Sequence, residues 1–174
     1  ESQWKSIDSI TIKYHWDDRE KLKKDYFFIE TIYESLLKET ADHLNFIHKV
    51  DFSYRYWRIL IGPWLGYFTQ VIFDRWETIE AALHNFNIDS CKVLLTNDVE
   101  LVPNDMTEFL SLIISDEWNE AIYAQILQRY FINRIDIQSV VNNKSSKSNK
   151  VSKVNKLKFF INGLIDKING YSSK

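Results

Sequence analysis

Apolar residues recur every three or four positions over the first long segment of the chain, residues 17–48. The positions in this stripe are Leu22, Tyr26, Ile29, Tyr33, Leu36, Thr40, Leu44 and Ile47. Such spacing gathers side chains on one face of a helix. Asp17 is followed three positions later by Glu20, which is the pattern of a capping box. We therefore expect one long amphipathic helix that begins near Asp17.

A second apolar stripe covers residues 57–83, and either Asp51 or Ser53 is suited to cap the helix that it predicts. The Gly62-Pro63 pair interrupts this stripe without changing its phase. Two interpretations remain open. One helix could be kinked at Pro63, because proline cannot donate the backbone hydrogen bond of that turn. Alternatively, a short helix ends there and a new one begins with Pro63 at its first position.

Three short segments predict strands, because they alternate, are β-branched or form a brief apolar run: residues 9–14, 90–96 and 134–141. Residues 107–115 and 117–130 predict two further helices. An order of strand, helices, strand, helices, strand is typical of the α/β class. Three short strands make a poor sheet alone. We therefore expect a helix-dominated α/β fold whose few short, parallel strands belong to a larger unit.

The end of the chain differs in composition from the rest. Residues 142–155 are rich in Ser, Asn and Lys and lack apolar periodicity, which is typical of a flexible linker. Residues 156–170 predict a short amphipathic, basic helix. The expected organisation is thus a helix-rich α/β domain over residues 1–141, then the linker, then this helix. Residues 156–168 could touch an anionic membrane surface, but docking of the helix on its own protein is favoured.

The charge distribution excludes one class of partner. The net charge is −2, although the residues after Val141 contain eight Lys and a single Asp, so the preceding part is acidic. Because nucleic-acid binding needs a positive face, an acidic body argues against nucleic acid as a partner. The single cysteine, Cys91, excludes an intrachain disulfide framework and fits a reducing cytoplasm. The N-terminus shows no secretory signal, and residues 59–73 are too short an apolar run to span a membrane.

The first candidate site lies where the first predicted strand runs into the first helix, which is the edge where open α/β sheets bind ligands. His15 could act there as a general base. Asp17 and Asp18 could accept hydrogen bonds from sugar hydroxyls, with Tyr14 and Arg19 as further substrate-binding candidates beside them. The structural alternative is that these carboxylates cap the helix and complement its dipole.

The second candidate site contains Arg55, Arg58 and Gly62, which share one helix face. If a helix begins at Pro63, its free backbone N–H groups point to the same region. Arginines beside a helix N-terminus would hold a phosphate or a carboxylate. The alternative is that both arginines pair with aspartates and clamp the two long helices together.

Other signals favour ordinary structural roles. The spacing of His, Cys, Asp and Glu predicts no dedicated metal site, and the chain contains neither a glycine-rich phosphate loop nor a nucleophile elbow. The polar residues 97–100 follow a predicted strand but are typical of a loop. Cys91 opens an apolar strand, which favours a core thiol.

Several segments also resemble a known family. They are Tyr14–Glu20, Asp25-Tyr26, Arg55–Leu65, Asp74-Arg75, Val102-Pro103 and Tyr123–Leu127, in this order. The arrangement resembles a family of transferases encoded in bacterial O-antigen and surface-carbohydrate gene clusters, first noted in Leptospira. The resemblance covers residues 10–130, and the segments near residues 14–20 and 55–65 are long and unusual.

This resemblance implies an incomplete Rossmann-like N-terminal half of a two-domain glycosyltransferase-like fold, inactive or nearly so without its C-terminal domain. A nucleotide-sugar donor would bind mainly to that C-terminal half, so this segment would bind no cofactor itself. A sugar or lipid-linked acceptor would lie near His15, Asp17, Asp18, Arg55 and Arg58. The location implied is cytoplasmic, with peripheral contact at the inner membrane as an option. The rival hypothesis is a non-catalytic helical module that binds a partner protein or the membrane surface.

Overall fold

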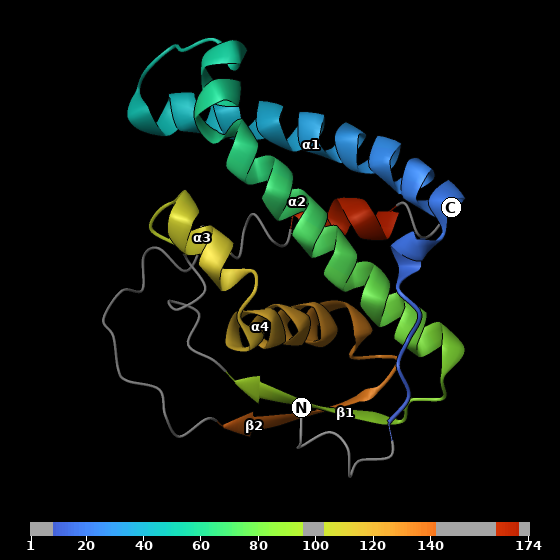
Figure 1. The fold of residues 1–174 in the computed structure, drawn as a ribbon. Helices are drawn as coiled ribbons and strands as arrows, with labels where there is room; N and C mark the ends of the chain where they lie inside the picture. The colour runs from blue at the N-terminus through green and yellow to red at the C-terminus, as the bar shows by residue number, and fades with distance from the viewer. Residues whose placement is uncertain (1–8, 96–102, 142–162, 171–174) are drawn as a thin grey trace.

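The computed structural model describes residues 9–95, 103–141 and 163–170. Two long helices dominate it, α1 (Arg19–His48) and α2 (Tyr54–Asn85), which pack against each other as an antiparallel hairpin (Figure 1). The helix over residues 17–48 was therefore predicted almost to its ends. Lys49 adopts a left-handed conformation with φ of 53° and ends α1, which allows the chain to reverse.

The caps of the two helices refine the predictions. Asp18 caps α1, because its side chain accepts hydrogen bonds from the backbone N–H groups of Glu20 and Lys21. The expected cap, Asp17, instead ends a short 3₁₀ turn over His15–Asp17, so that prediction was wrong by one residue. Of the two candidates for α2, Ser53 is the cap and accepts from the backbone N–H of Tyr56.

Pro63 lies inside α2, and the helix continues through it. The interpretation in which a new helix begins at Pro63 is therefore wrong. Apolar residues on both sides of the proline, such as Trp57 and Leu65, are buried on one continuous face. Burial of that face outweighs the backbone hydrogen bond that proline cannot make.

The sheet consists of two parallel strands within the described ranges, β1 (Ser90–Leu95) and β2 (Asp136–Val141). Their register pairs Ser90 with Asp136 and Leu95 with Val141. The helix-dominated α/β class with short parallel strands is thus confirmed. The first of the three predicted strands, residues 9–14, is wrong, because this segment has no regular structure and Ile10 is 75 % exposed. An alternating pattern cannot form a strand without a neighbour to pair with.

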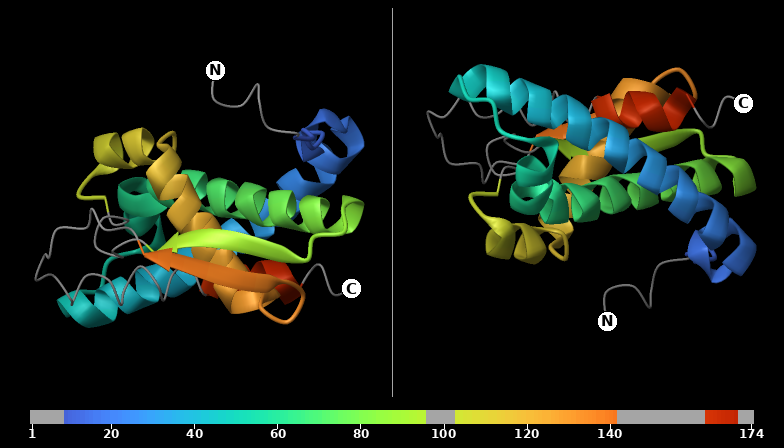
Figure 2. Two further views of the ribbon diagram at one scale, coloured as in Figure 1. Left: turned by 90° about the horizontal axis from the view of Figure 1, so that it is seen from below. Right: turned by 90° about the horizontal axis from the view of Figure 1, so that it is seen from above.

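The remaining helices connect the hairpin to the strands. They are α3 (Met106–Leu112) and α4 (Asp116–Ile126), and α4 runs on into a π-helical turn over Leu127–Phe131. Figures 1 and 2 show α4 lying between α2 and the strand pair. The core therefore forms around α2 and α4. Its largest fully buried rings are Trp76, Phe68, Phe73, Phe109 and Phe131.

A terminal helix over residues 163–170 packs on its own protein, as favoured from the sequence. Its apolar residues Leu164 and Ile168 are fully buried, and Lys167 pairs with Glu39 of α1 at 2.8 Å. Membrane contact through residues 156–168 stays a prediction, and the predicted linker, residues 142–155, lies outside the described ranges. Among the helices that the structure describes, none combines the length and the apolar character needed to cross a bilayer.

Candidate functional site

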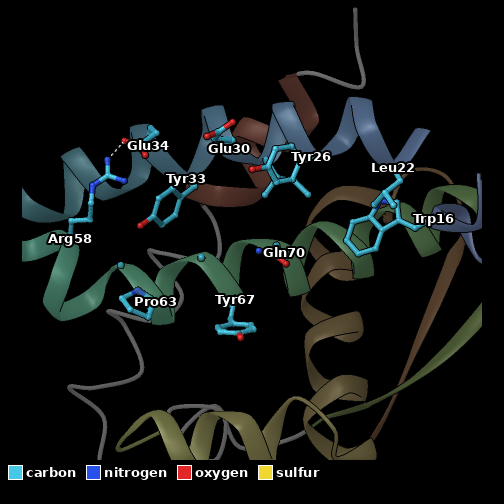
Figure 3. Close-up of a pocket in the computed structure, with 13 residues that line it drawn as sticks. Trp16, Leu22, Tyr26, Glu30, Tyr33, Glu34, Arg58, Pro63, Tyr67 and Gln70 are labelled. Atoms are coloured by element: carbon cyan, nitrogen blue, oxygen red, sulfur yellow. Dashed lines mark hydrogen bonds and ion pairs between the residues drawn. The ribbon is translucent and has the colours of Figure 1, made fainter. Parts of the chain in front are cut away.

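An elongated groove of about 650 Å³ lies between α1 and α2 (Figure 3). We call it the α1/α2 groove. Tyr26 and Tyr33 contribute rings from α1, and Tyr67 contributes a ring from α2. Arg58 marks one end of the groove and Trp16 the other. Its volume falls in the range of small-molecule sites, which are typically 300–1,000 Å³.

At the first end, Arg58 forms an ion pair with Glu34 of α1. The hydroxyl of Tyr54 donates to the same carboxylate at 2.7 Å, and the Arg58 guanidinium lies 5.0 Å from the centre of the Tyr54 ring. Hydrogen bonds from Arg58 and Tyr54 lower the pKa of Glu34 below its ordinary value. Arg58 therefore clamps α2 to α1 through Glu34 and also forms a wall of the groove.

The floor of the groove is made of residues that disfavour helices. Gly62, Pro63 and Gly66 all line it, within five positions of α2. A Cβ atom at Gly62 would lie 2.7 Å from the hydroxyl oxygen of Tyr33, so this glycine lets the tyrosine approach α2. A Cβ atom at Gly66 would meet Tyr33 at an ordinary contact distance of 3.7 Å. Close packing therefore explains the glycine at position 62 but not the one at position 66.

At the second end, Trp16 connects the groove to buried charges. Its indole N–H donates to Asp25 Oδ2 at 3.0 Å. The Lys21 ammonium lies 2.7 Å from Asp25 Oδ2 and 2.7 Å from Glu77 Oε2, which joins α1 to α2. We call the following residues the charged network: His15, Lys21, Asp25, Asp74 and Glu77.

His15, the predicted base, lies inside the charged network with a side chain only 5 % exposed. Its Nε2 atom is 3.0 Å from Asp74 Oδ1, while its buried Nδ1 atom makes no hydrogen bond within the described part of the chain. Asp25 Oδ2 lies 3.9 Å from that nitrogen. The ring centre of His15 is 4.7 Å from that of Trp16. His15 is therefore separated from the groove by the ring of Trp16, which lines it.

Two shifted pKa values follow from this arrangement. Burial alone would raise the pKa of Asp74, but hydrogen bonds from His15 and Tyr14 and the positive charge of Arg75 outweigh it, so the pKa lies below its ordinary value. Partial burial, the negative charge of Asp74 and a hydrogen bond to Asp74 raise the pKa of Tyr14 to about 12. Asp74 is thus held as a carboxylate and Tyr14 as a neutral hydroxyl at neutral pH.

One atom each of His15, Asp25 and Glu77 lies within 4.8 Å of the others, which is close enough for a metal ion. Lys21 already occupies the space between the two carboxylates, with its ammonium 2.7 Å from each. A divalent cation would have to displace that ammonium before it could bind. The arrangement is therefore described best as an ion-pair network.

Comparison with known families assigns the chain to a family. Residues 1–172 match the family described as LIC12162 family transferase. The chain belongs to this family. No curated protein and no solved structure gives a significant match. The family assignment confirms the predicted transferase character at the level of the family and extends beyond residues 10–130, which carried the resemblance.

The candidates predicted from the sequence of this LIC12162 family transferase divide into two groups. Only Arg58 and Gly62 line the α1/α2 groove. The others lie outside the groove lining: His15 is buried in the charged network, Asp18 caps α1, and Tyr14, Asp17, Arg19 and Arg55 are exposed. The structure thus does not bring the two predicted sites together around one open cleft. Catalytic roles for His15 and Asp17 stay predictions.

Sequence reasoning missed several residues of the groove. They are Trp16, Tyr26, Glu30, Tyr33, Glu34, Tyr67 and Gln70. Tyr26 and Tyr33 were assigned to the apolar stripe of α1, yet Tyr26 is 60 % exposed. Their hydroxyl groups could have separated them from the aliphatic members of the stripe, because tyrosine often lies at a polar boundary.

The lowered pKa of Asp74 predicts how stability depends on pH. A carboxylate that ionises more readily when folded adds stability above its unfolded pKa, about 3.9, and loses it as the pH falls through the folded value. We therefore expect the urea midpoint to fall on acidification below about pH 4. Asp74→Asn should flatten this decline. An equally steep decline in the variant would contradict the assignment.

Proposed function

We propose that this chain forms the acceptor side of a glycosyltransferase-like enzyme of surface-polysaccharide (O-antigen) synthesis, with the α1/α2 groove as the acceptor site. The nucleotide-sugar donor would bind to a C-terminal domain of the same enzyme, and this chain alone would be inactive or nearly so. The acceptor would be a sugar or a lipid-linked sugar.

The composition of the groove floor carries this proposal. Inside a helix, each glycine costs about 1 kcal/mol relative to alanine, and a proline costs about 3 kcal/mol. Gly62, Pro63 and Gly66 all lie on the face of α2 that lines the groove, so these costs to helix stability fall there. Local choices that oppose the fold concentrate at functional sites. Packing does not require a glycine at position 66, since a Cβ atom there would make only ordinary contacts. We therefore attribute this glycine to the groove, which a larger side chain would partly fill.

His15 has a place in this proposal through Trp16. The imidazole is held by Asp74 and lies against the indole that ends the groove. Because the side chain of His15 is only 5 % exposed, it is suited to hold the Trp16 ring in position. We therefore assign His15 a positioning role, and its role as a base would require the Trp16 ring to move aside.

Filling the groove should abolish sugar binding without unfolding the chain. Gly66→Leu places a large side chain on the groove floor and replaces a poor helix former by a good one. We expect at least a tenfold loss of affinity for the saccharides that the wild type binds, measured by saturation-transfer NMR with a panel of mono- and disaccharides. The matched control is Lys38→Leu, an exposed position of α1 outside the groove.

Either of two results would overturn this assignment. Unchanged binding by Gly66→Leu would exclude the groove as the sugar site. A wild-type chain that binds no saccharide of the panel would contradict the acceptor-side function itself.

A second candidate function is binding of a partner protein or membrane surface, and one observation favours it. Large apolar side chains are exposed at the tip of the α1–α2 hairpin: Phe46, Ile47, Phe52, Tyr56, Ile59 and Leu60. Phe46 is 82 % exposed and Ile59 69 %. Clustered exposed apolar residues commonly mark interaction surfaces. Flotation with anionic liposomes that is lost in Ile59→Asp would support this function.

A further inference from the structure

The charge of the α1/α2 groove limits which ligand can bind there. The charged residues of its lining are Glu30, Glu34 and Arg58. The Arg58 charge is neutralised by Glu34 in an ion pair that Tyr54 also supports. Glu30 has neither an ion pair nor a hydrogen bond within the described part of the chain. A ligand in the groove therefore meets one uncompensated carboxylate.

The remaining surface of the groove is aromatic and lightly polar. Tyr26 is 60 % exposed on α1, and Tyr67 is 52 % exposed on α2. Both residues line the groove, and Gln70 adds an amide one turn beyond Tyr67. Exposed rings offer flat apolar surface, whereas a carboxylate accepts hydrogen bonds from hydroxyl or amino groups. Sugars carry both an apolar C–H face and hydroxyl donors.

An acidic ligand fits this surface poorly. A phosphate or uronic acid would be repelled by the negative charge of Glu30. It could form an ion pair with Arg58 only if the ion pair between Arg58 and Glu34 were broken. The pKa of Glu34 is lowered by its bonds to Arg58 and Tyr54, which means that the folded structure stabilises this carboxylate in its ionised, paired form. The sequence pattern of two arginines suggested an anion site. In the groove, however, Arg58 is paired with Glu34, and Arg55 lies outside the lining, so we expect little attraction for an anion there.

We propose that the α1/α2 groove selects an uncharged or amino sugar, with Glu30 accepting hydrogen bonds from the sugar, and that it discriminates against acidic and phosphorylated sugars. The proposal rests on the acceptor-side function argued above and adds the substrate class. Glu30 acts in it as the specificity-determining residue.

The test compares three methyl glycosides that differ in charge, methyl glucoside, methyl glucosaminide and methyl glucuronide, together with glucose 1-phosphate as a phosphorylated sugar. Dissociation constants for the full chain are measured by NMR titration at neutral pH. We expect the glucuronide and the phosphate to bind at least tenfold more weakly than the glucoside, and the amino sugar to bind at least as tightly. Glu30→Gln should reduce this discrimination to less than threefold, since the amide keeps the size of the side chain and removes its charge.

Glu117→Gln is the matched control, because Glu117 is exposed on α4 outside the groove. Equal or tighter binding of the glucuronide by the wild type would overturn the proposed substrate class, and so would discrimination that Glu30→Gln leaves unchanged. In both cases, loss of binding in Gly66→Leu would still support the acceptor site. Absence of binding by every sugar would instead contradict the proposed function.

Discussion

Replacing Trp76 by alanine is expected to lower the free energy of unfolding by about 3–5 kcal/mol. Trp76 is 1 % exposed and belongs to the largest fully buried side chains of the described structure. Its ring centre lies 5.0 Å from that of Phe131 and 5.4 Å from that of Tyr130, so it joins α2 to the π-helical turn that leads to β2. Alanine would leave a cavity between these elements. Urea denaturation followed by far-ultraviolet circular dichroism measures the change.

Trp76→Phe separates ring volume from hydrogen bonding. The buried indole Nε1 of Trp76 has no hydrogen-bond partner within the described ranges. An unsatisfied buried donor costs about 1–3 kcal/mol, so phenylalanine loses ring volume but removes this cost. We expect a net loss of less than about 1.5 kcal/mol. A loss as large as that of Trp76→Ala would show that the indole N–H is satisfied after all.

The two long helices could be predicted from the sequence because their stripes persist over many turns. The stripe of α2 keeps its phase through Gly62-Pro63, and the structure follows this continuity through the proline. Residues 9–14 show the opposite case. Their alternation is a local property, whereas a strand also needs a neighbour, and none of the described strands pairs with this segment. Long periodic segments are therefore predicted more reliably than short alternating ones.

The candidate site could be predicted only in part. Arg58 and Gly62 were found because they share a helix face, which is a local relation. Glu34, the partner of Arg58, lies 24 positions away, and Asp74, the partner of His15, lies 59 positions away. No spacing rule connects such pairs, since their contact depends on how α1 packs against α2. The roles of Arg58 as a clamp and of His15 as a buried residue therefore needed the structure.

Asp74→Ala is expected to cost about 3–5 kcal/mol of unfolding free energy, because it breaks a buried pair and leaves its partners behind. Asp74 is 8 % exposed, accepts from His15 Nε2, and pairs with Arg75. Without this carboxylate, His15 would have neither ring nitrogen satisfied, since Nδ1 already lacks a partner in the described structure. The loss should appear in urea denaturation and in thermal unfolding alike.

Asp74→Asn is the informative comparison, because the amide keeps the shape and one acceptor oxygen for His15 but offers no charge to Arg75. We expect a cost between those of the wild type and the alanine variant. If the charged network also positions Trp16, both variants should weaken sugar binding at the α1/α2 groove under conditions where they remain folded, since His15 packs against that indole. Full stability in Asp74→Ala would show that the network contributes little to the fold. If Asp74→Ala shows the expected loss of unfolding free energy but binds sugar as tightly as the wild type while folded, the charged network acts in folding only. His15 would then have no positioning role at the groove.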